Sequence, residues 1–473
     1  MRIARDEIFG PVLSVLTFRT PDEAVAKANN TPYGLSAGVW TEKGSRILGM
    51  ASALRAGVVW ANTFNRFDPA VAFGGYKESG FGREGGRSGL SAYLNTDDDA
   101  VVTPARPTVS SAPVDGAISA DAHGAVAHDA DALPGADAPH EVGGPAEADA
   151  VAVVAAAQSA RSTAATHAPS DESRGTGTGQ TDEPARIAVS KTYKLYIGGA
   201  FPRSESGRTY QAVGGPDGSI LANVAQGSRK DARDAVSAAR KAFKGWSSAT
   251  AYNRGQVIYR IAEMLEGRRA QFVDLLGGGA DAAGTVDAAI DRLVHYAGWT
   301  DKLASVFGSA NPVAGPFFSF STPEPTGVVA VVAPQHDPLL GLVSVLAPVI
   351  TSGNTAVLIA AQHQPMAAVT LAEVLATSDL PGGVVNLLTG DPAEIAPHLA
   401  AHADVNALDL TGTDGTLRTE LERAAAGTLK RVFAPSVGDF TGAPGTARMR
   451  AFLEIKSVWH PTGALSLGGG GGY

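Results

Sequence analysis

The chain has 473 residues, of which 44% are hydrophobic and 18% are charged, and its formal net charge is -9 at pH 7. This composition is typical of a soluble globular protein, and the negative charge argues against a nucleic-acid-binding surface, which needs clustered Lys and Arg. The chain contains no cysteine. This excludes disulfides, thiolate metal ligands and a cysteine nucleophile, and it favours a reducing compartment.

The sequence shows no targeting or membrane segment. Residues 1–9 lack the apolar core of a signal peptide. No run reaches the roughly 20 apolar residues of a membrane helix. The longest apolar stretches, 327–333 and 339–350, are interrupted by Gly, Pro or Ser, and we interpret them as a buried strand and a buried helix. We therefore expect a cytoplasmic protein without membrane partners.

Residues 1–96 form the first of the composition regions and have a globular texture. Alternating β-branched and aromatic residues predict strands, and the acids after Pro21 predict the first turn of a helix. The Gly-rich end of the region predicts a loop. The expected elements are a strand at 9–18, a helix at 23–29, strands at 35–40 and 57–62, and a loop at 73–86.

Residues 97–188 have a different composition, dominated by Ala, Asp, Gly, Pro, Ser and Thr and rich in acids. Such a segment buries too little apolar surface to offset its chain entropy, so we predict a disordered linker. Its four histidines are scattered without a regular ligand spacing, and we assign no metal site. They are His123, His128, His140 and His167.

In residues 189–463 strand and helix patterns alternate, and the last ten residues, 464–473, form a Gly-rich tail. Continuous β-branched runs are typical of strands that are buried on both faces of a parallel sheet. Alternation of such strands with helices predicts an α/β fold with a doubly wound, Rossmann-type sheet. Segment 193–202 is expected to be a strand, a Gly-Gly turn and a second short strand. The other expected strands are 327–334, 355–360, 384–390 and 406–412; the expected helices are 228–246, 254–276, 286–307, 339–350, 366–377 and 392–402.

Several of these segments resemble the aldehyde dehydrogenase family. GVVAVVAP at 327–334, GNTAVL at 353–358, LPGGVVNLLTG at 380–390 and LTGT at 410–413 are similar to its NAD(P)-binding half. EIFGPV at 7–12, the segment 23–41 and FGGYKESGFGREGG at 73–86 are similar to its final quarter. The resemblance implies an aldehyde dehydrogenase-like fold with an incomplete catalytic domain.

The order of the two similar regions is reversed relative to the family. The family's C-terminal segment comes first, at 1–96, and its N-terminal cofactor-binding half follows the linker, at 189–463. The chain therefore resembles the tail of one unit fused through a linker to the degenerate head of a second, as in tandem-unit aldehyde dehydrogenases. Segment 452–461 resembles the very end of a unit.

The family's chemistry needs a thiolate nucleophile, an oxyanion donor and a glutamate that activates water. The resemblance places His336 where the family has the oxyanion asparagine, and Pro435 near the place of the glutamate. Glu420 and Glu422 are expected to be solvated on a helix. Because the segment that carries the cysteine is missing, we assign no catalytic residue.

The resemblance implies a cofactor, NAD or NADP, but only part of its site is kept. Ile359 stands where the family has the lysine that binds the adenosine ribose, and Gln362 replaces the neighbouring acid. Gly412 and Thr413 match the residues that open the phosphate-facing helix, where amides and the helix dipole favour an anion. Glu7 and Phe9 match the residues that contact the nicotinamide ribose; they could equally be a surface acid and a core aromatic.

Three functions are compatible with these observations. The first is a catalytically inactive, structural subunit that assembles with a complete aldehyde dehydrogenase or with itself. The second is an NAD(P)-dependent oxidoreductase that oxidises aldehydes to carboxylic acids at a site completed by another chain. The third is a truncated gene product.

Overall fold

The computed structural model describes residues 3, 5–91, 93–94, 191–214, 219–435 and 439–463. The predicted linker at 97–188 and the predicted tail at 464–473 lie outside this set. Residues 3–94 and 191–463 belong to one compact unit.

The cofactor-like half is built on a five-stranded parallel sheet with the strand order β12-β11-β10-β13-β14. Ala330 in the central strand lies opposite Val357 on one side and Leu408 on the other. Every strand of this sheet except β14 is buried throughout, which explains the apolar sequence of these strands. The sheet consists of β10 (Val328–Val332), β11 (Thr355–Ile359), β12 (Val385–Leu388), β13 (Ala407–Asp409) and β14 (Arg431–Phe433).

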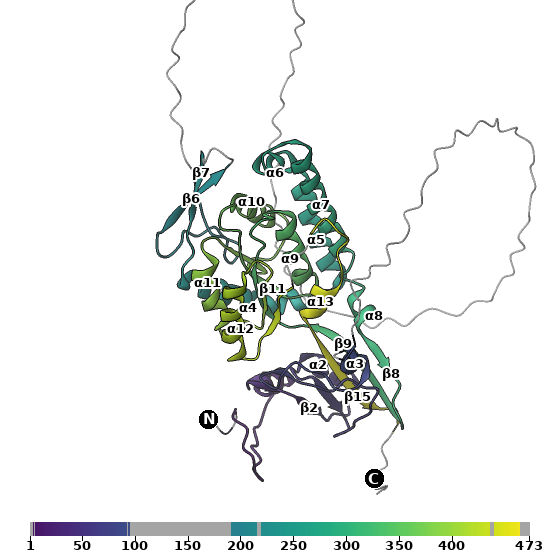
Figure 1. Ribbon diagram of the computed structural model, residues 1–473. Coiled ribbons are helices and arrows are strands. Elements are labelled where there is room, and N and C mark those ends of the chain that lie inside the picture. The colour runs from purple at the N-terminus through teal and green to yellow at the C-terminus, as the bar shows by residue number, and fades with distance from the viewer. Residues whose placement is uncertain are drawn as a thin grey trace, which may run out of the picture. The chain divides into compact units, whose positions relative to one another are not determined.

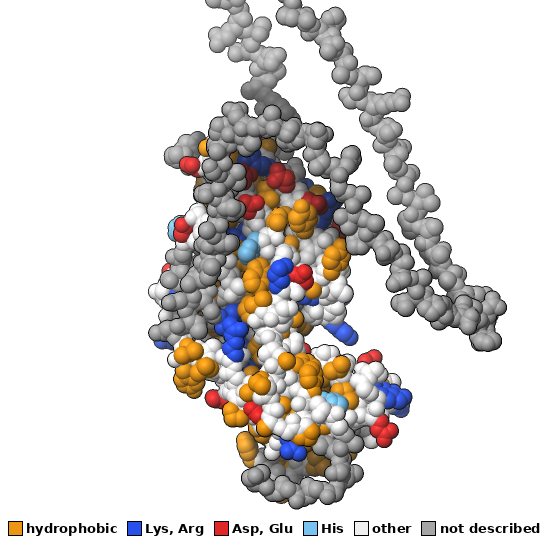
Figure 2. Space-filling model, turned by 90° about the vertical axis from the view of Figure 1, so that its right-hand side faces the viewer, with side chains coloured by type: hydrophobic (Ala, Val, Ile, Leu, Met, Phe, Trp, Pro, Cys, Tyr) orange, Lys and Arg blue, Asp and Glu red, His pale blue; other side chains and the backbone are white. Residues whose placement is uncertain are grey.

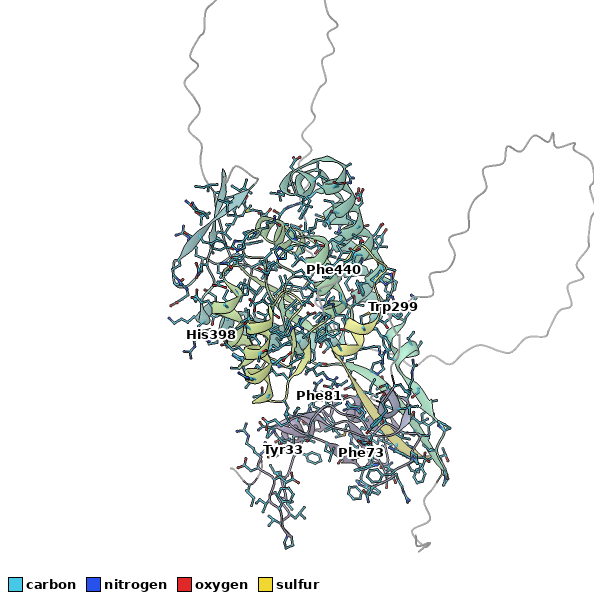
Figure 3. The ribbon with its side chains drawn as sticks, viewed as in Figure 1. Tyr33, Phe73, Phe81, Trp299, His398 and Phe440 are labelled. Atoms are coloured by element: carbon cyan, nitrogen blue, oxygen red, sulfur yellow. The ribbon has the colours of Figure 1, made fainter. Side chains whose placement is uncertain are left out.

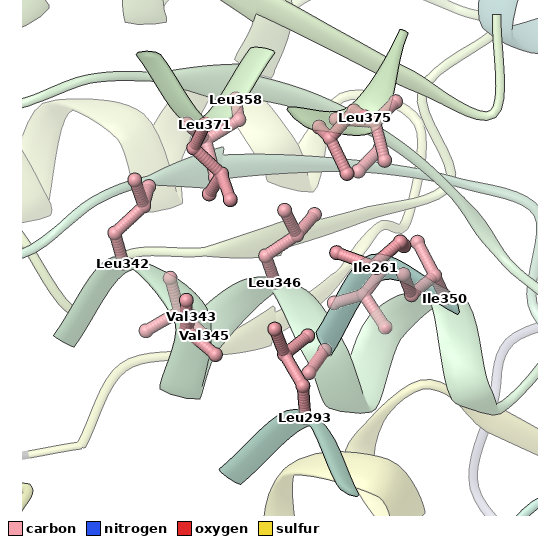
Figure 4. Packing of buried hydrophobic residues seen from close by; sticks show 14 of the residues in the cluster. Ile261, Leu293, Leu342, Val343, Val345, Leu346, Ile350, Leu358, Leu371 and Leu375 are labelled. Atoms are coloured by element: carbon pink, nitrogen blue, oxygen red, sulfur yellow. The ribbon is translucent and has the colours of Figure 1, made fainter. Parts of the chain in front are cut away.

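Helices cover both faces of this sheet, so the predicted doubly wound α/β architecture is confirmed. One apolar cluster lies on the face that carries α4 (Arg229–Ser248), α11 (Pro392–Ala400) and α12 (Gly415–Ala426). The other, larger cluster contains α9 (Leu340–Thr351) and α10 (Met366–Leu375), with α5 (Ala251–Glu266) and α7 (Gly279–Ala297) packed outside them. Figure 4 shows side chains of α9 packed between those of β11, α10 and α7.

Two of the predicted helices are each divided in the structure. The helix expected at 254–276 is α5 followed by α6 (Arg269–Leu275), with Gly267 as the C-cap residue of α5. The helix expected at 286–307 is α7, which begins earlier at Gly279, and the separate α8 (Leu303–Phe307).

A second, mixed sheet has the order β2-β3-β15-β9-β8 and joins the two ends of the chain. Strand β15 (Leu453–Pro461) pairs with β3 (Val58–Ala61) in parallel, with Ser457 opposite Val58, and with β9 (Phe317–Pro325) in antiparallel orientation. The edges are β2 (Ser36–Val39) and β8 (Ser309–Asn311). Residues 33–91 are therefore attached to the cofactor-like half by backbone pairing (Figure 1).

Buried cations reinforce this joint. The Lys456 side chain is fully buried, and its ammonium group donates to Ala51 O at 3.0 Å and lies 2.7 Å from a Glu324 carboxylate oxygen. Burial lowers the pKa of Lys456, and the nearby Glu324 carboxylate opposes that shift. Arg55 donates to Thr326 O at 2.9 Å. A cation buried in this way is tolerated only because carboxylate and carbonyl oxygens surround it.

The prediction of a strand at 9–18 is wrong for this chain. The segment bends at residues 9–11 and lies in no sheet, and no described strand runs beside it. The helix and the strands expected after it are confirmed as α1 (Pro21–Asn29), β2 and β3. The remaining elements are β1 (Tyr33–Gly34), α2 (Gly44–Ala53), β4 (Tyr76–Lys77), α3 (Gly86–Ser91), β5 (Thr192–Tyr193), β6 (Thr209–Gly214), β7 (Ser219–Ala225) and α13 (Ala447–Ala451).

The described surface mixes charged and apolar groups. On the face drawn in Figure 2, basic and acidic side chains are interspersed among hydrophobic ones. Among the helices of the described residues, none is both long and apolar enough to cross a membrane.

Candidate dinucleotide site

The candidate site lies at the carboxyl ends of β10 and β13. The chain runs from β10 outward to β11 and β12 and then returns to the other side of β10 to form β13. The strand order therefore reverses between β10 and β13. In doubly wound sheets, ligands bind in the crevice outside the strand ends at such a point. Gly412 and Thr413, which the sequence predicts to bind cofactor, lie in the loop between β13, which ends at Asp409, and α12.

The polar groups of Gly412 and Thr413 are already used within the protein. The amide of Gly412 donates to Val332 O at 2.9 Å, and a Cβ added at Gly412 would lie 1.8 Å from Ala333 O. The amide of Thr413 donates to Leu410 O at 3.1 Å, and its hydroxyl donates to the same oxygen at 2.7 Å. Gly412 is thus required for the close approach of two backbones, and both residues direct their donors toward β10 and β13.

The helix that follows, α12, begins with a carboxylate at its N-terminus. Asp414 is the N-cap residue, and its Oδ1 accepts a hydrogen bond from Leu417 N at 2.8 Å. An aspartate cap stabilises the helix because it satisfies a free amide and interacts favourably with the helix dipole. It also places negative charge where a phosphate group would bind. The end of α12 therefore does not fit a dinucleotide pyrophosphate.

The loops after β10 and β11 are tied together by Gln335. Its Nε2 donates to Ala333 O at 2.7 Å, and its Oε1 accepts from Gln362 N at 3.0 Å. Ile359, at the place of the family's ribose lysine, is completely buried at the end of β11. No lysine or arginine occurs between Ala333 and Gln362. These two loops therefore offer no cation for a ribose or a phosphate.

A buried ion pair, which the sequence did not predict, lies at the end of β13. The Asp409 carboxylate is completely buried and pairs with Arg448 of α13, whose side chain is 12% exposed. Arg448 also donates to Thr411 Oγ1 at 3.0 Å and lies over the ring of Phe433, 4.8 Å from its centroid. Charge compensation explains why Asp409 is tolerated at the end of a buried strand.

The segment that carries Arg448 is held from a second direction. Arg292 of α7 donates to Phe440 O at 2.6 Å and to Gly442 O at 2.9 Å, and also to Ser344 Oγ at 2.8 Å. Burial lowers the pKa of Arg292. The Phe440 ring packs against the larger apolar cluster (Figure 3). Residues 439–451 are thus packed against the cofactor-like half rather than leading into a catalytic domain.

The other predicted cofactor residues, Glu7 and Phe9, lie on the extended N-terminal segment. Glu7 is exposed and lines a cavity of 730 Å³ whose lining residues all come from residues 3–54. Phe9 is 97% exposed. No hydrogen bond, ion pair or ring contact of the described residues joins Glu7 or Phe9 to Gly412 or Thr413. The structure does not bring the two halves of the predicted site together.

Residues at the family's catalytic places have different surroundings. His336 lines a cavity of 790 Å³ together with Asp337 and His363. Pro435 contributes only its carbonyl oxygen, which accepts from Arg418 at 2.9 Å. Glu420 and Glu422 are exposed on α12, which confirms that they are solvated. Among the described residues, no group of three or more His, Asp or Glu side chains could hold a metal ion.

Comparison with known proteins decides the family. The model of the aldehyde dehydrogenase family matches residues 1–98 and 201–438, which is more than half of the chain. The chain belongs to the aldehyde dehydrogenase family. The match falls in the two regions that the sequence motifs indicate, on either side of the predicted linker.

Several relatives match about half of the chain. It is 30% identical over 258 residues to the cytosolic 10-formyltetrahydrofolate dehydrogenase of Mus musculus, covering 52% of this chain and 28% of that protein. It is 31% identical over 263 residues to an aldehyde dehydrogenase of Davidiella tassiana, covering 54% of this chain and 52% of the relative. A solved NAD+ complex of the aldehyde dehydrogenase from Bacillus cereus is 27% identical, with a TM-score of 0.48, over 51% of this chain and 50% of that one. The chain thus spans at most about half the length of these relatives.

Proposed function

We propose that this protein is a non-catalytic aldehyde dehydrogenase-family subunit with a structural role. The proposal rests on the hydrogen bonds and the charge at the crevice where the strand order reverses between β10 and β13. There, Gly412 and Thr413 direct their donors to carbonyl oxygens of their own chain, and Asp414 caps α12 with a negative charge. The whole chain also lacks the cysteine that the family's reaction requires.

The proposal also covers the order of the two matched regions in the chain and the cellular location of the protein. The reversed order of the two matched regions supports a tail of one unit fused to the degenerate head of a second. The β3–β15 pairing, the buried Lys456 and the partly buried Arg55 support a joint that serves packing rather than chemistry. We also propose a cytoplasmic location, which the cytosolic forms among the relatives support.

An activity assay tests this proposal. Purified full-length protein is mixed with NAD or NADP and a panel of aldehydes, and NAD(P)H is followed by absorbance, with a complete aldehyde dehydrogenase as the positive control. We expect no turnover above the rate without protein. Sustained NAD(P)H production by the pure chain would overturn the proposal.

A second candidate, an oxidoreductase whose site is completed by another chain, makes a different prediction. Such a chain would supply the cysteine and the glutamate, and its addition would have to create an activity that neither protein has alone. The 790 Å³ cavity beside His336 is the feature that favours this candidate. Titration of a cysteine-bearing family chain against this protein, with activity as the readout, distinguishes the two.

A further inference from the structure

A cavity of 460 Å³ lies between α3, α13 and β15 (Figure 1). Of the described residues that line it, four are arginines and none is Asp or Glu. These arginines come from the Gly-rich loop, α3, β14 and α13, so only the fold brings them together. They are Arg83, Arg87, Arg431 and Arg450. A cavity lined by charge of one sign concentrates ions of the opposite sign.

The carboxylate beside these arginines does not balance their charge. Arg83 and Arg431 share a single carboxylate, that of Glu454. Arg87 is exposed and forms no ion pair with a described residue. Burial lowers the pKa of Arg450, and the positive charge of Arg87 lowers it further. The guanidinium groups therefore repel one another, and a bound anion would relieve this repulsion.

Two of these arginines have hydrogen-bond donors left for a ligand. Arg431 binds Glu454 through Nε at 3.1 Å and Nη2 at 2.6 Å, and its Nη1 has no acceptor among the described residues. Arg87 donates no hydrogen bond to any described residue. Arg83, in contrast, donates to Ile455 O through Nε and Nη2 and to three carbonyl oxygens through Nη1. Arg83 thus contributes charge, whereas Arg87 and Arg431 also offer donors.

The cavity also has apolar walls. Phe81 is 43% exposed, and the guanidinium carbon of Arg431 lies 5.1 Å from its ring centroid. The other apolar lining residues are Phe307, Ala447, Ala451, Leu453 and Ile455. Pockets for small molecules typically have about 300–1,000 Å³, mainly apolar walls and a few polar groups that fix the orientation of the ligand. The cavity therefore has room for an anionic group together with the apolar body that carries it.

We propose that this cavity binds an organic phosphomonoester, with the phosphate group at Arg87 and Arg431 and the apolar body against Phe81. Arginine suits a phosphate because its planar guanidinium can form two parallel hydrogen bonds to the phosphate oxygens. A phosphomonoester carries about -1.5 to -2 charges at pH 7, so it compensates more of the arginine charge than a carboxylate does. The inference goes beyond the proposed function, because it involves neither NAD(P) nor an aldehyde.

Calorimetric titration of the purified full-length chain with phenyl phosphate tests the inference. We expect saturable binding that is several-fold tighter than the binding of inorganic phosphate, because the phenyl ring gains contact with the apolar walls. Phenol, which lacks the phosphate group, is expected not to bind. Absence of saturable heat with phenyl phosphate, or equal affinities for phenyl phosphate and inorganic phosphate, would overturn the inference.

Substitution of Arg87 locates the binding in the cavity. Arg87→Met removes a guanidinium that contacts no described acceptor, so the fold is expected to be kept while phenyl phosphate binds roughly tenfold more weakly. Arg87→Lys keeps the charge but not the planar fork, and it is expected to bind with an affinity between those of Arg87→Met and the wild-type chain. Arg203→Met is the matched control, because Arg203 is also exposed but does not line the cavity. Equal weakening by Arg87→Met and Arg203→Met would show that net charge alone attracts the ligand, which contradicts the site.

The outcome for this cavity is separate from the outcome for the proposed function. The titration contains no cofactor and no aldehyde, and NAD+ itself carries no phosphomonoester group. A chain that binds phenyl phosphate but produces NAD(P)H would keep the cavity and overturn the proposed function. A chain that does neither would keep the proposed function and overturn the cavity.

Discussion

Arg83 and Glu454 form a buried ion pair between residues that are 371 positions apart in the sequence. Their Nη2 and Oε2 atoms are 3.2 Å apart, and each side chain is only 6% exposed. Arg431 approaches the same carboxylate oxygen at 2.6 Å and lies over the Phe81 ring. Burial lowers the pKa of Arg83, and Glu454 opposes that shift. The pair links the Gly-rich loop of the N-terminal region, in which Phe81 is labelled in Figure 3, to β15.

Removal of one partner of this pair is expected to lower the free energy of unfolding. Arg83→Met leaves the Glu454 carboxylate buried with one cation fewer, and we expect a loss of about 3 kcal/mol in the free energy of unfolding, measured in urea. Arg233→Met is the control, because its pair with Asp234 is exposed and is expected to contribute less than about 1 kcal/mol. Equal small losses in the two variants would show that the buried pair does not hold the joint.

Gly57 is predicted to tolerate no side chain. A Cβ at this position would lie 1.8 Å from Gly74 O, so Gly57→Ala must push two backbone segments apart. We expect a loss of at least about 2 kcal/mol in urea unfolding. Gly49→Ala is the matched control: it lies inside α2 with no atom within 4 Å of the added Cβ. This control is expected to stabilise the protein by about 0.5–1 kcal/mol. A well-tolerated Gly57→Ala would contradict the packing of residues 57 and 74.

The stability of the protein is expected to rise with pH above neutrality. Burial lowers the pKa of Lys430 to about 8, and burial together with Arg55 lowers that of Lys77 to about 8. A lysine in the unfolded chain titrates near about 10.4. Between these values the unfolded state holds more protons, so the free energy of unfolding increases with pH. Below pH 8 both states are protonated, and the cost of the buried cations is fully present.

The variant Lys77→Met/Lys430→Met tests this pH dependence. Without the two buried ammonium groups, the rise in the free energy of unfolding between pH 7.5 and 9 is expected to become smaller. Urea denaturation at several pH values measures the change. A double variant with the wild-type slope would show that other groups cause the rise.

The Asp409–Arg448 pair is expected to hold residues 439–451 against the end of β13. Asp409→Asn leaves Arg448 without its carboxylate, and we expect a loss of about 3 kcal/mol and faster tryptic cleavage after Arg448 and Arg450. The double variant Asp409→Asn/Arg448→Met removes the unpaired charge and is expected to recover part of the loss. Losses that simply add in the double variant would show that the two residues do not interact.

The sequence predicted the parallel sheet well because its strands are buried on both faces. The runs at 327–334 and 355–360 contain almost no polar residue, and this pattern depends only on burial. Segment 9–18 has the same local pattern but lies outside any sheet, since strand formation requires a neighbour and no strand of the described residues lies beside it. The pairing of β15 with β3 could not be predicted, because nothing local indicates which distant strand is adjacent.

The candidate site was only partly predictable for a similar reason. The motif LTGT indicated Gly412 and Thr413, but the Gly412 amide donates to Val332 O of β10, which only the fold places nearby, and the Thr413 donors bond to Leu410 O just after β13. The cap Asp414 is visible in the sequence as an acid before a helix, a signal that could have been used. Arg448 gives no such signal, because its role depends on Asp409, 39 residues earlier.

Calorimetric titration of the purified full-length chain with NAD+ tests the central claim most directly. The chain's own hydrogen bonds at Gly412 and Thr413, and the Asp414 carboxylate at the start of α12, predict no saturable heat up to millimolar NAD+, while a complete aldehyde dehydrogenase titrated in parallel binds. Saturable binding with a micromolar dissociation constant would contradict the account, because it would require these groups to accommodate the pyrophosphate.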